Sequence, residues 1–158
     1  MTTLFTADTH FGHGGALGLF RRPFSSVQEM DAALISAWNA AVQPNDEIWH
    51  IGDFAVRHRD PAALLAGLHG VKHLVPGNND AAGIRELPGW TSVCPLVELE
   101  RDGVKLILCH YALRTWPGMG RGTLNLHGHS HGRLPPKPDQ FDVGVEARGF
   151  RPVRLREL

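Results

Sequence analysis

Short apolar runs and one amphipathic stretch set the pattern of the first half of the chain. Residues 2–7, 47–54 and 71–80 each begin with the apolar and β-branched residues of a strand and end in a polar loop. Between the first two strands, apolar side chains recur three and four positions apart over residues 23–42, a spacing that predicts a helix with one buried face. The residues of that face are Val27, Met30, Leu34, Trp38 and Ala41.

Capping residues predict where two helices begin. Ser26 precedes Glu29 by three residues, which is the capping-box pattern at the start of the long helix. Asp60 followed by Pro61 favours the start of a shorter helix that runs to Leu68, because Asp caps the first turn and proline fits its first position.

The second half consists mainly of strands. Residues 93–100 and 104–110 flank the Arg-Asp-Gly segment 101–103, and an Asp-Gly step is a strong hairpin signal. Alternating strands and helices followed by strands alone predict an α/β protein with two layers of mixed sheet and helices outside. There is no internal repeat and no linker, so we expect one domain over residues 1–158. The further strands are expected at 123–128, 140–145 and 152–156.

The composition and the net charge are those of an ordinary globular protein and do not favour a nucleic-acid or membrane partner. Apolar residues make up 42% and charged residues 20% of the chain, as in ordinary domains. Lysine plus arginine equal aspartate plus glutamate at 16 each, so no overall field favours nucleic acid or a membrane. Cys94 and Cys109 have no paired spacing and are expected to be reduced thiols in a cytoplasmic protein. Neither a secretory signal nor an apolar run near the ~18 residues of a membrane span is visible.

Residues able to bind metal ions gather where the expected strands end. In open α/β sheets the ligand crevice lies beyond the carboxyl ends of the strands, so segments far apart in sequence can converge there. Glycine accompanies most of these clusters and permits tight turns. In chain order the clusters are Asp8-Thr9-His10, Gly52-Asp53, Gly77-Asn78-Asn79-Asp80, Cys109-His110 and Gly128-His129-Ser130-His131.

The donor types and their spacing favour a transition-metal centre. Residues two apart in an extended chain point to the same side, so Asp8 with His10, and His129 with His131, are each expected to aim at one centre. Carboxylate, imidazole and amide oxygen donors suit Mn, Fe, Zn or Co better than Ca or Mg. The absence of thiolate clusters argues against a structural zinc site. Any one cluster is a common pattern, whereas five at successive strand ends leave little room for a purely structural interpretation.

These ordered motifs resemble those of the calcineurin-like metallophosphoesterases, which read D-x-H, G-D, G-N-H-[DE], a lone H and G-H-x-H. The likeness covers residues 8–131, and further segments resemble a small bacterial group of predicted phosphoesterases. The resemblance implies a four-layer α/β/β/α sandwich with two mixed β-sheets. It also implies two divalent transition metal ions bridged by Asp53, with Mn favoured and Fe, Zn, Co or Ni as alternatives. The other implied ligands are Asp8, His10 and His131 for the first ion and Asn78, His110 and His129 for the second.

One motif position departs from the family pattern. Asn79 stands where the family has a histidine that contacts the substrate phosphate and can protonate the leaving oxygen, and Asp80 stands where an acid orients it. The resemblance gives both a place in the catalytic site, although an amide can donate a hydrogen bond but cannot act as a general acid. Three accounts are open: an engineered change, a natural enzyme that works without this acid, or lost catalysis. We favour the first two, because all seven implied ligands are intact.

The resulting interpretation is a two-metal hydrolase of phosphate esters that uses a metal-bridging hydroxide. No insertion is long enough to cap the site, which favours a phosphodiesterase acting on small or nucleotide substrates. A phosphomonoesterase and a non-catalytic binding scaffold of the same fold are the alternatives, and only Asn79 favours the scaffold. Balanced charge without a basic stripe argues against an extended nucleic-acid track. The sequence does not define the physiological substrate, the native metals or the oligomeric state.

Several other polar residues are candidates for substrate contacts. His13 lies in a Gly-rich loop expected to overhang the site, where binding residues are common. Arg114, and with it Arg21 and Arg22, could clamp a phosphate bidentately. His50, within the second expected strand, is interpreted as a core or sheet-face residue.

Overall fold

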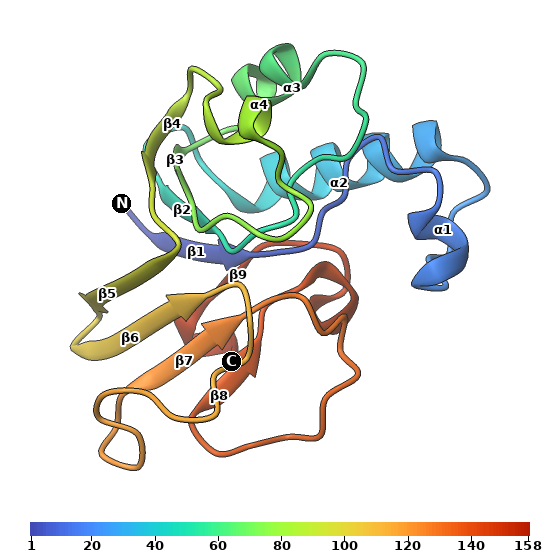
Figure 1. Ribbon diagram of the computed structural model, residues 1–158. Coiled ribbons are helices and arrows are strands. Elements are labelled where there is room, and N and C mark those ends of the chain that lie inside the picture. The colour runs from blue at the N-terminus through green and yellow to red at the C-terminus, as the bar shows by residue number, and fades with distance from the viewer.

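Two mixed β-sheets packed face to face form the centre of the molecule, which is described here over residues 1–158 by a computed structural model (Figure 1). In the first sheet the order is β4-β3-β2-β1-β9, with β1 to β4 parallel and β9 antiparallel to β1. In the second the order is β5-β6-β7-β8, with β5 antiparallel to β6 and the others parallel. The strands are β1 (Thr3–Thr6), β2 (Glu47–His50), β3 (Val71–Leu74), β4 (Trp90–Val93), β5 (Leu96–Arg101), β6 (Val104–Cys109), β7 (Leu124–His127), β8 (Gln140–Asp142) and β9 (Val153–Arg154).

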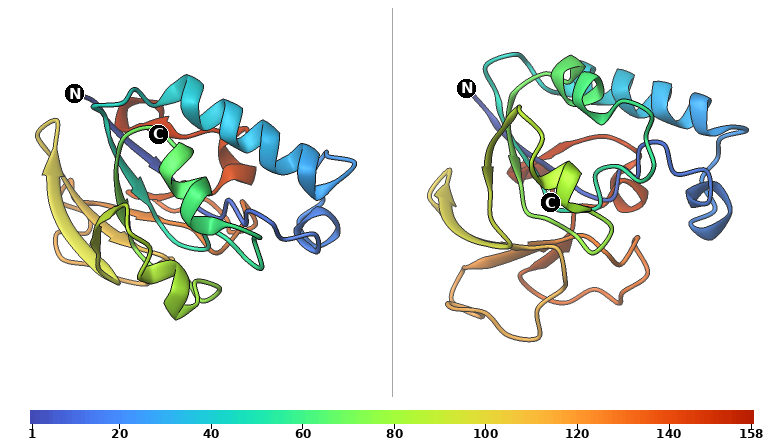
Figure 2. Two further views of the ribbon diagram at one scale, coloured as in Figure 1. Left: turned by 90° about the horizontal axis from the view of Figure 1, so that it is seen from above. Right: turned by 45° about the horizontal axis from the view of Figure 1, so that its top comes forward.

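All four α-helices precede the second sheet in the chain, and the two longest, α2 and α3, cover the outer face of the first sheet (Figures 1 and 2). No helix is both long enough and apolar enough to cross a membrane. The helices are α1 (Ala16–Leu19), α2 (Val27–Ala41), α3 (Pro61–Gly67) and α4 (Ala82–Arg85), followed by the 3₁₀ turns η1 (Val145–Arg148) and η2 (Leu155–Glu157).

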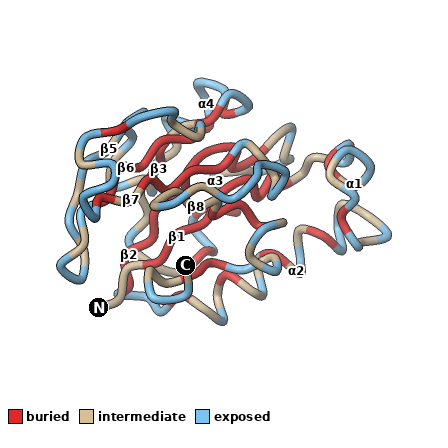
Figure 3. Tube along the Cα trace, turned by 90° about the horizontal axis from the view of Figure 1, so that it is seen from below, coloured by how far each residue is buried: buried red, intermediate tan, exposed pale blue.

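Successive residues of the central strands supply two separate cores. Leu4 of β1 and Ile48 of β2 point towards the helices and join a cluster of 15 buried residues. Their neighbours Phe5 and Trp49 point the other way and join nine buried residues between the two sheets. Because both faces of this sheet are covered, all four residues of β2 are buried, the polar Glu47 and His50 included. Figure 3 shows the buried positions concentrated along these strands.

The expected helix starts are confirmed, one of them in part. The Ser26 hydroxyl accepts the Glu29 N–H at 3.1 Å, as the capping pattern predicts. The Glu29 carboxylate, however, accepts the N–H of Ser25 at 2.7 Å instead of that of Ser26, so the box is only half formed. Asp60 accepts the Ala63 N–H at 3.0 Å and caps α3.

The hairpin is confirmed, but the strand expected before it is divided. Asp102 and Gly103 have φ of 52° and 75°, the left-handed pair that a tight two-residue hairpin turn requires. The apolar run 93–100 belongs to two sheets, because Val93 ends β4 in the first and Leu96 begins β5 in the second. A proline between them has no N–H to offer a ladder, and the chain changes sheets there.

The fold class is confirmed: two mixed sheets pack against each other with helices outside them. No α-helix follows Arg85, so the outer face of the second sheet is not covered by helices. The loop between β6 and β7 lies there instead, held by Trp116, whose indole N–H donates to the carbonyl of Thr123 at 2.8 Å. The loop explains why this half of the chain carries no helical periodicity.

Candidate metal centre

The polar clusters that follow the strands meet at one end of the two sheets. They form two groups, and within each group one ligand atom per residue lies within 4.8 Å of the others. The members are Asp8, His10 and His131 in the first group and Asp53, His110 and His129 in the second. The side chains come from four strand ends in both sheets, so only the packed sandwich can assemble them.

Asp53 lies between the two groups. Its Oδ2 atom is 3.4 Å from Nε2 of His10 and 3.5 Å from Nε2 of His110. Burial alone would raise the pKa of Asp53, but His10, His110 and the amide of Asn79 outweigh it and hold that pKa well below the usual range. The Nε2 atom of His10 is buried without a hydrogen-bond partner. An anionic oxygen facing two imidazole nitrogens at this spacing fits a shared cation.

The second group is completed by an amide oxygen. Oδ1 of Asn78 is 3.2 Å from Nε2 of His110 and 3.0 Å from Nδ1 of His129. The other ring nitrogen of His110, Nδ1, is 2.8 Å from the carbonyl oxygen of Ile51. Since only a protonated Nδ1 can donate to that carbonyl, the Nε2 lone pair is left to face Asn78 and Asp53.

Asp8 contributes a buried carboxylate with few partners. Both of its oxygens accept the backbone N–H of His129, at 3.1 and 3.0 Å. Burial raises the pKa of Asp8 well above its usual value, and the nearby Asp53 adds to the shift, against the opposing effect of His110. Two carboxylates in a buried pocket favour the binding of positive charge.

The backbone at these positions is strained. Five of the ten non-glycine residues with positive φ belong to the two groups, namely Asp8 (57°), His10 (50°), Asp53 (58°), His129 (64°) and His131 (49°). Such left-handed residues cost roughly 1–2 kcal/mol each and persist where the surrounding structure enforces them, often at functional sites. Side chains are excluded nearby, because a Cβ on Gly52 would lie 2.2 Å from Nδ1 of His110.

This backbone geometry corrects one prediction from spacing. We expected His129 and His131 to aim at one centre, but His131 joins Asp8 while His129 joins Asp53. The two-residue alternation holds only for extended chain, and both histidines are left-handed. The division agrees with the ligand assignment implied by the family resemblance.

Asn79 and Asp80 both lie at the site. The Asn79 amide donates to Oδ2 of Asp53 at 2.8 Å, and its backbone N–H donates to Oδ1 at 2.8 Å. Asp80 does not hydrogen-bond to the Asn79 side chain. Its carboxylate accepts the N–H groups of Asp53, Phe54 and Gly77 at 2.7–2.8 Å, so it fastens the two ligand loops to each other.

Arg22 is a structural residue and is not available to a phosphate. It is 5% exposed, and its guanidinium donates to the carbonyls of Asp8 and Thr9 at 2.6 and 2.7 Å and to Glu146 at 2.7–2.8 Å. Oε2 of Glu146 is 3.0 Å from Nδ1 of His131. No local pattern indicates this chain of contacts, since Glu146 lies 124 residues after Arg22.

Of the candidate substrate residues, His13 lies beside the first group, whereas Arg114 lies outside both groups. Nδ1 of His13 is 3.1 Å from Nδ1 of His10, so His13 borders the first group. Arg114 is exposed and makes no side-chain contact with either group. Two aromatic residues that sequence reasoning missed do lie at the site: Phe20 stacks on His131 with ring centroids 3.6 Å apart, and Tyr111 packs edge-on to His129 at 4.9 Å.

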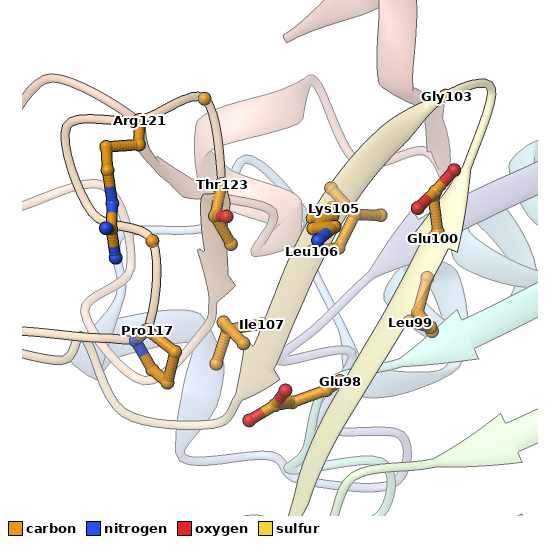
Figure 4. A pocket seen from close by; sticks show the side chains of 12 residues that line it. Glu98, Leu99, Glu100, Gly103, Lys105, Leu106, Ile107, Pro117, Arg121 and Thr123 are labelled. Carbon is orange, nitrogen blue, oxygen red and sulfur yellow. The ribbon is translucent and has the colours of Figure 1, made fainter.

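A cavity of about 750 Å³ lies on the outer face of the second sheet and includes none of these residues (Figure 4). Glu98, Lys105 and Arg121 give it a mixed charge, and Ile107 forms its floor beside the β6–β7 loop. Because no group of metal-binding residues lines this cavity, the strand-end cluster remains the candidate site.

The comparisons with known proteins agree with this geometry. No protein-family model matches the chain. An uncharacterized protein of Methanocaldococcus jannaschii is 29% identical over 159 residues, which cover 94% of this chain and 84% of that protein. A protein of unknown function from Aquifex aeolicus has a crystal structure that superimposes with a TM-score of 0.80 at 22% identity, covering 98% of this chain and 96% of its own.

Two solved structures carry functional names. A novel archaeal phosphodiesterase superimposes with a TM-score of 0.54 at 19% identity, covering 91% of this chain and 82% of its own. The phosphoesterase Yfce of E. coli superimposes with a TM-score of 0.51 at 18% identity, covering 91% and 78%. The chain therefore has the fold of the calcineurin-like metallophosphoesterases, as the order of its motifs predicts.

Proposed function

We propose that residues 1–158 act as one metallophosphoesterase domain that hydrolyses phosphate esters at two divalent cations, with Mn favoured. The observation that carries the proposal is the position of Asp53, which faces His10 and His110 at 3.4 and 3.5 Å from the same oxygen atom. Asp8, His10 and His131 would hold the first ion with Asp53, and Asn78, His110 and His129 would hold the second with it. Carboxylate, imidazole and carboxamide donors are typical ligands of Mn and related ions.

Two cations at these positions would supply Lewis-acid charge to the phosphoryl group and activate the attacking water. The chain's own residues account for the rest of the chemistry. The amide of Asn79 lies at the exposed side of Asp53 and can donate a hydrogen bond to a phosphoryl oxygen. Asn79 offers no acidic proton, so leaving groups that need no protonation are favoured.

The openness of the site supports a diester substrate. Asn78, Asn79 and His129 are exposed, and the ring of Tyr111 beside His129 is 47% exposed. A phosphate bound at this edge has room for two ester groups, one of which can lie against Tyr111. We therefore favour phosphodiesterase activity on small or nucleotide substrates over phosphomonoesterase activity, and we expect no extended nucleic-acid track. The cytoplasmic location expected from the two unpaired cysteines stays a prediction.

The proposal is tested with metal-stripped protein to which Mn²⁺ is returned. We expect turnover of bis-p-nitrophenyl phosphate to exceed that of p-nitrophenyl phosphate and to depend on two bound Mn²⁺ per chain. His129→Ala should abolish turnover, whereas Arg121→Ala, which alters an exposed residue at the outer face of the second sheet, should leave it unchanged. Two bound Mn²⁺ without any turnover, in this chain and in Asn79→His alike, would favour the alternative of a non-catalytic metal-holding scaffold.

A further inference from the structure

A buried ion pair lies directly behind the first metal group. The Arg22 guanidinium and the Glu146 carboxylate contact each other at 2.7–2.8 Å, and their side chains are 0% and 11% exposed. Burying two such charges is unfavourable unless close contacts offset the loss of water. The contacts that this pair makes towards the site are therefore informative.

Both residues of the ion pair also contact residues of the first metal group or its loop. Arg22 donates to the carbonyls of Asp8 and Thr9, which fixes the strained backbone between Asp8 and His10. Glu146 places Oε2 at 3.0 Å from Nδ1 of His131. The alignment of these two atoms falls short of a full hydrogen bond, and neither has another partner.

We propose that Arg22 and Glu146 are positioning residues for the first cation: Glu146 keeps the proton of His131 on Nδ1, so that Nε2 is the metal-binding atom, and Arg22 holds Glu146 and the Asp8 loop in register. The inference rests on the proposed metal centre. A carboxylate behind a metal-binding histidine fixes the tautomer and raises the basicity of the ring. Phe20, stacked on the same ring at 3.6 Å and 11°, fixes its plane.

The second group has no such pair, which makes the effect selective. The outer nitrogen of His110 faces the backbone carbonyl of Ile51, a partner that no side-chain substitution removes. Neither Arg22 nor Glu146 contacts His110, His129 or Asn78. Loss of the pair should therefore weaken one of the two cations and leave the other in place.

The first experiment titrates Mn²⁺ into metal-stripped protein by calorimetry. Glu146→Gln keeps the size of the side chain but removes its charge, and we expect the affinity of one Mn²⁺ to fall by about 10- to 100-fold while the other is unchanged. Arg22→Lys, which loses the planar fork, should show the same selectivity. Glu47→Gln is the control, because it breaks the distant Glu47–Arg101 pair (2.7 Å) and should change neither affinity.

The second experiment needs no metal. In ¹⁵N-histidine NMR spectra of the metal-free protein, His131 should be protonated on Nδ1, and Glu146→Gln should shift it towards the other tautomer, whereas Glu47→Gln should not. Unchanged affinity for both ions, an equal loss of both, or an unchanged His131 tautomer in Glu146→Gln would overturn the positioning role. Failure of the original chain to bind two Mn²⁺ would instead overturn the proposed metal centre, and the tautomer result tells the two failures apart.

Discussion

The two metal groups differ in how the protein holds them. The first is buried and is supported from behind by Arg22, Glu146 and the ring of Phe20. In the second, Asn78 and His129 are exposed and the ligands mainly contact one another. The first group, here called the closed half of the site, is therefore held rigidly by the protein, whereas the second, the open half, is accessible to solvent.

The physical reason lies in the loops that carry each group. The Asp8 loop is buried, and Arg22 donates to its carbonyl groups at Asp8 and Thr9, so its polar groups find protein partners. The Asn78 loop follows β3, and its side chains Asn78 and Asn79 reach water. The two loops therefore differ in burial, although β1 and β3 each lie one strand from an edge of the first sheet.

The largest expected effect tests what the two groups share. Asp53→Ala removes the oxygen that faces both His10 and His110, so both cations should be lost together and phosphodiesterase turnover should fall by about 10⁴-fold or more. Elemental analysis and bis-p-nitrophenyl phosphate kinetics check this. Retention of two ions per chain in this variant would contradict the role of Asp53 as a ligand shared by the two groups.

The next effect concerns the open half. Asn79→His places a proton donor at the exposed side of Asp53, where a general acid typically adds about 10²- to 10⁴-fold. Turnover of alkyl phosphodiesters should rise by about this factor, whereas that of nitrophenyl esters should change little, because a nitrophenolate leaves without protonation. Asn79→Gln, which keeps an amide, is the control. An equal change for both substrate classes would remove position 79 from proton transfer.

The third prediction concerns Asp8 in the closed half, where a substitution is expected to affect protein stability and cation binding in opposite directions. Because burial raises the pKa of Asp8, the metal-free folded state holds its proton more tightly than the unfolded state does. Ionised Asp8 therefore costs stability as pH rises from the unfolded pKa through the folded one. Asp8→Asn should raise the melting temperature of the metal-free protein by a few degrees at neutral pH, or about 1 kcal/mol, and not at pH 3.

The same variant should lose the first cation, whereas Asn78→Ala should lose the second with almost no change in melting temperature. Differential scanning calorimetry of the metal-free proteins, together with Mn²⁺ titration, measures both quantities. If Asp8→Asn proved less stable than the original chain at neutral pH, the cost assigned to the buried carboxylate would be wrong.

The last effect concerns His50, which supports the closed half through Thr9. Its Nε2 atom is 2.9 Å from the Thr9 hydroxyl, which in turn donates to the carbonyl of Phe54. Burial lowers the pKa of His50 to about 3, so the unfolded state binds the extra proton between about pH 6.5 and 3. Stability should therefore fall as pH drops through this window, by up to about 1.4 kcal/mol per unit from this group.

His50→Gln keeps a donor towards Thr9 but does not titrate. We expect it to cost about 1 kcal/mol at neutral pH through lost ring packing and to flatten the acid limb of the stability curve. Urea unfolding at several pH values gives both numbers. An acid limb as steep as that of the original chain would show that His50 does not carry this titration.

Features that depend on neighbours along the chain were predictable. The apolar face of α2, the Asp60 cap and the Asp102-Gly103 turn are set by spacing and local backbone preference, and the structure bears them out. Strand ends also marked where the polar clusters lie, because parallel strands direct their carboxyl ends to one side. The division at the Val93–Leu96 step was not predictable, since either sheet can accept an apolar strand.

The sequence by itself determined the chemistry that is available here: which donors follow which strand, and that one histidine of the family pattern is an asparagine. Only the tertiary structure decided how those donors divide between two groups, because left-handed backbone angles separate His129 from His131. It also decided that Arg22 serves Glu146 rather than a phosphate, since a contact across 124 residues leaves no local pattern. Local rules describe each segment, and packing alone decides which segments meet.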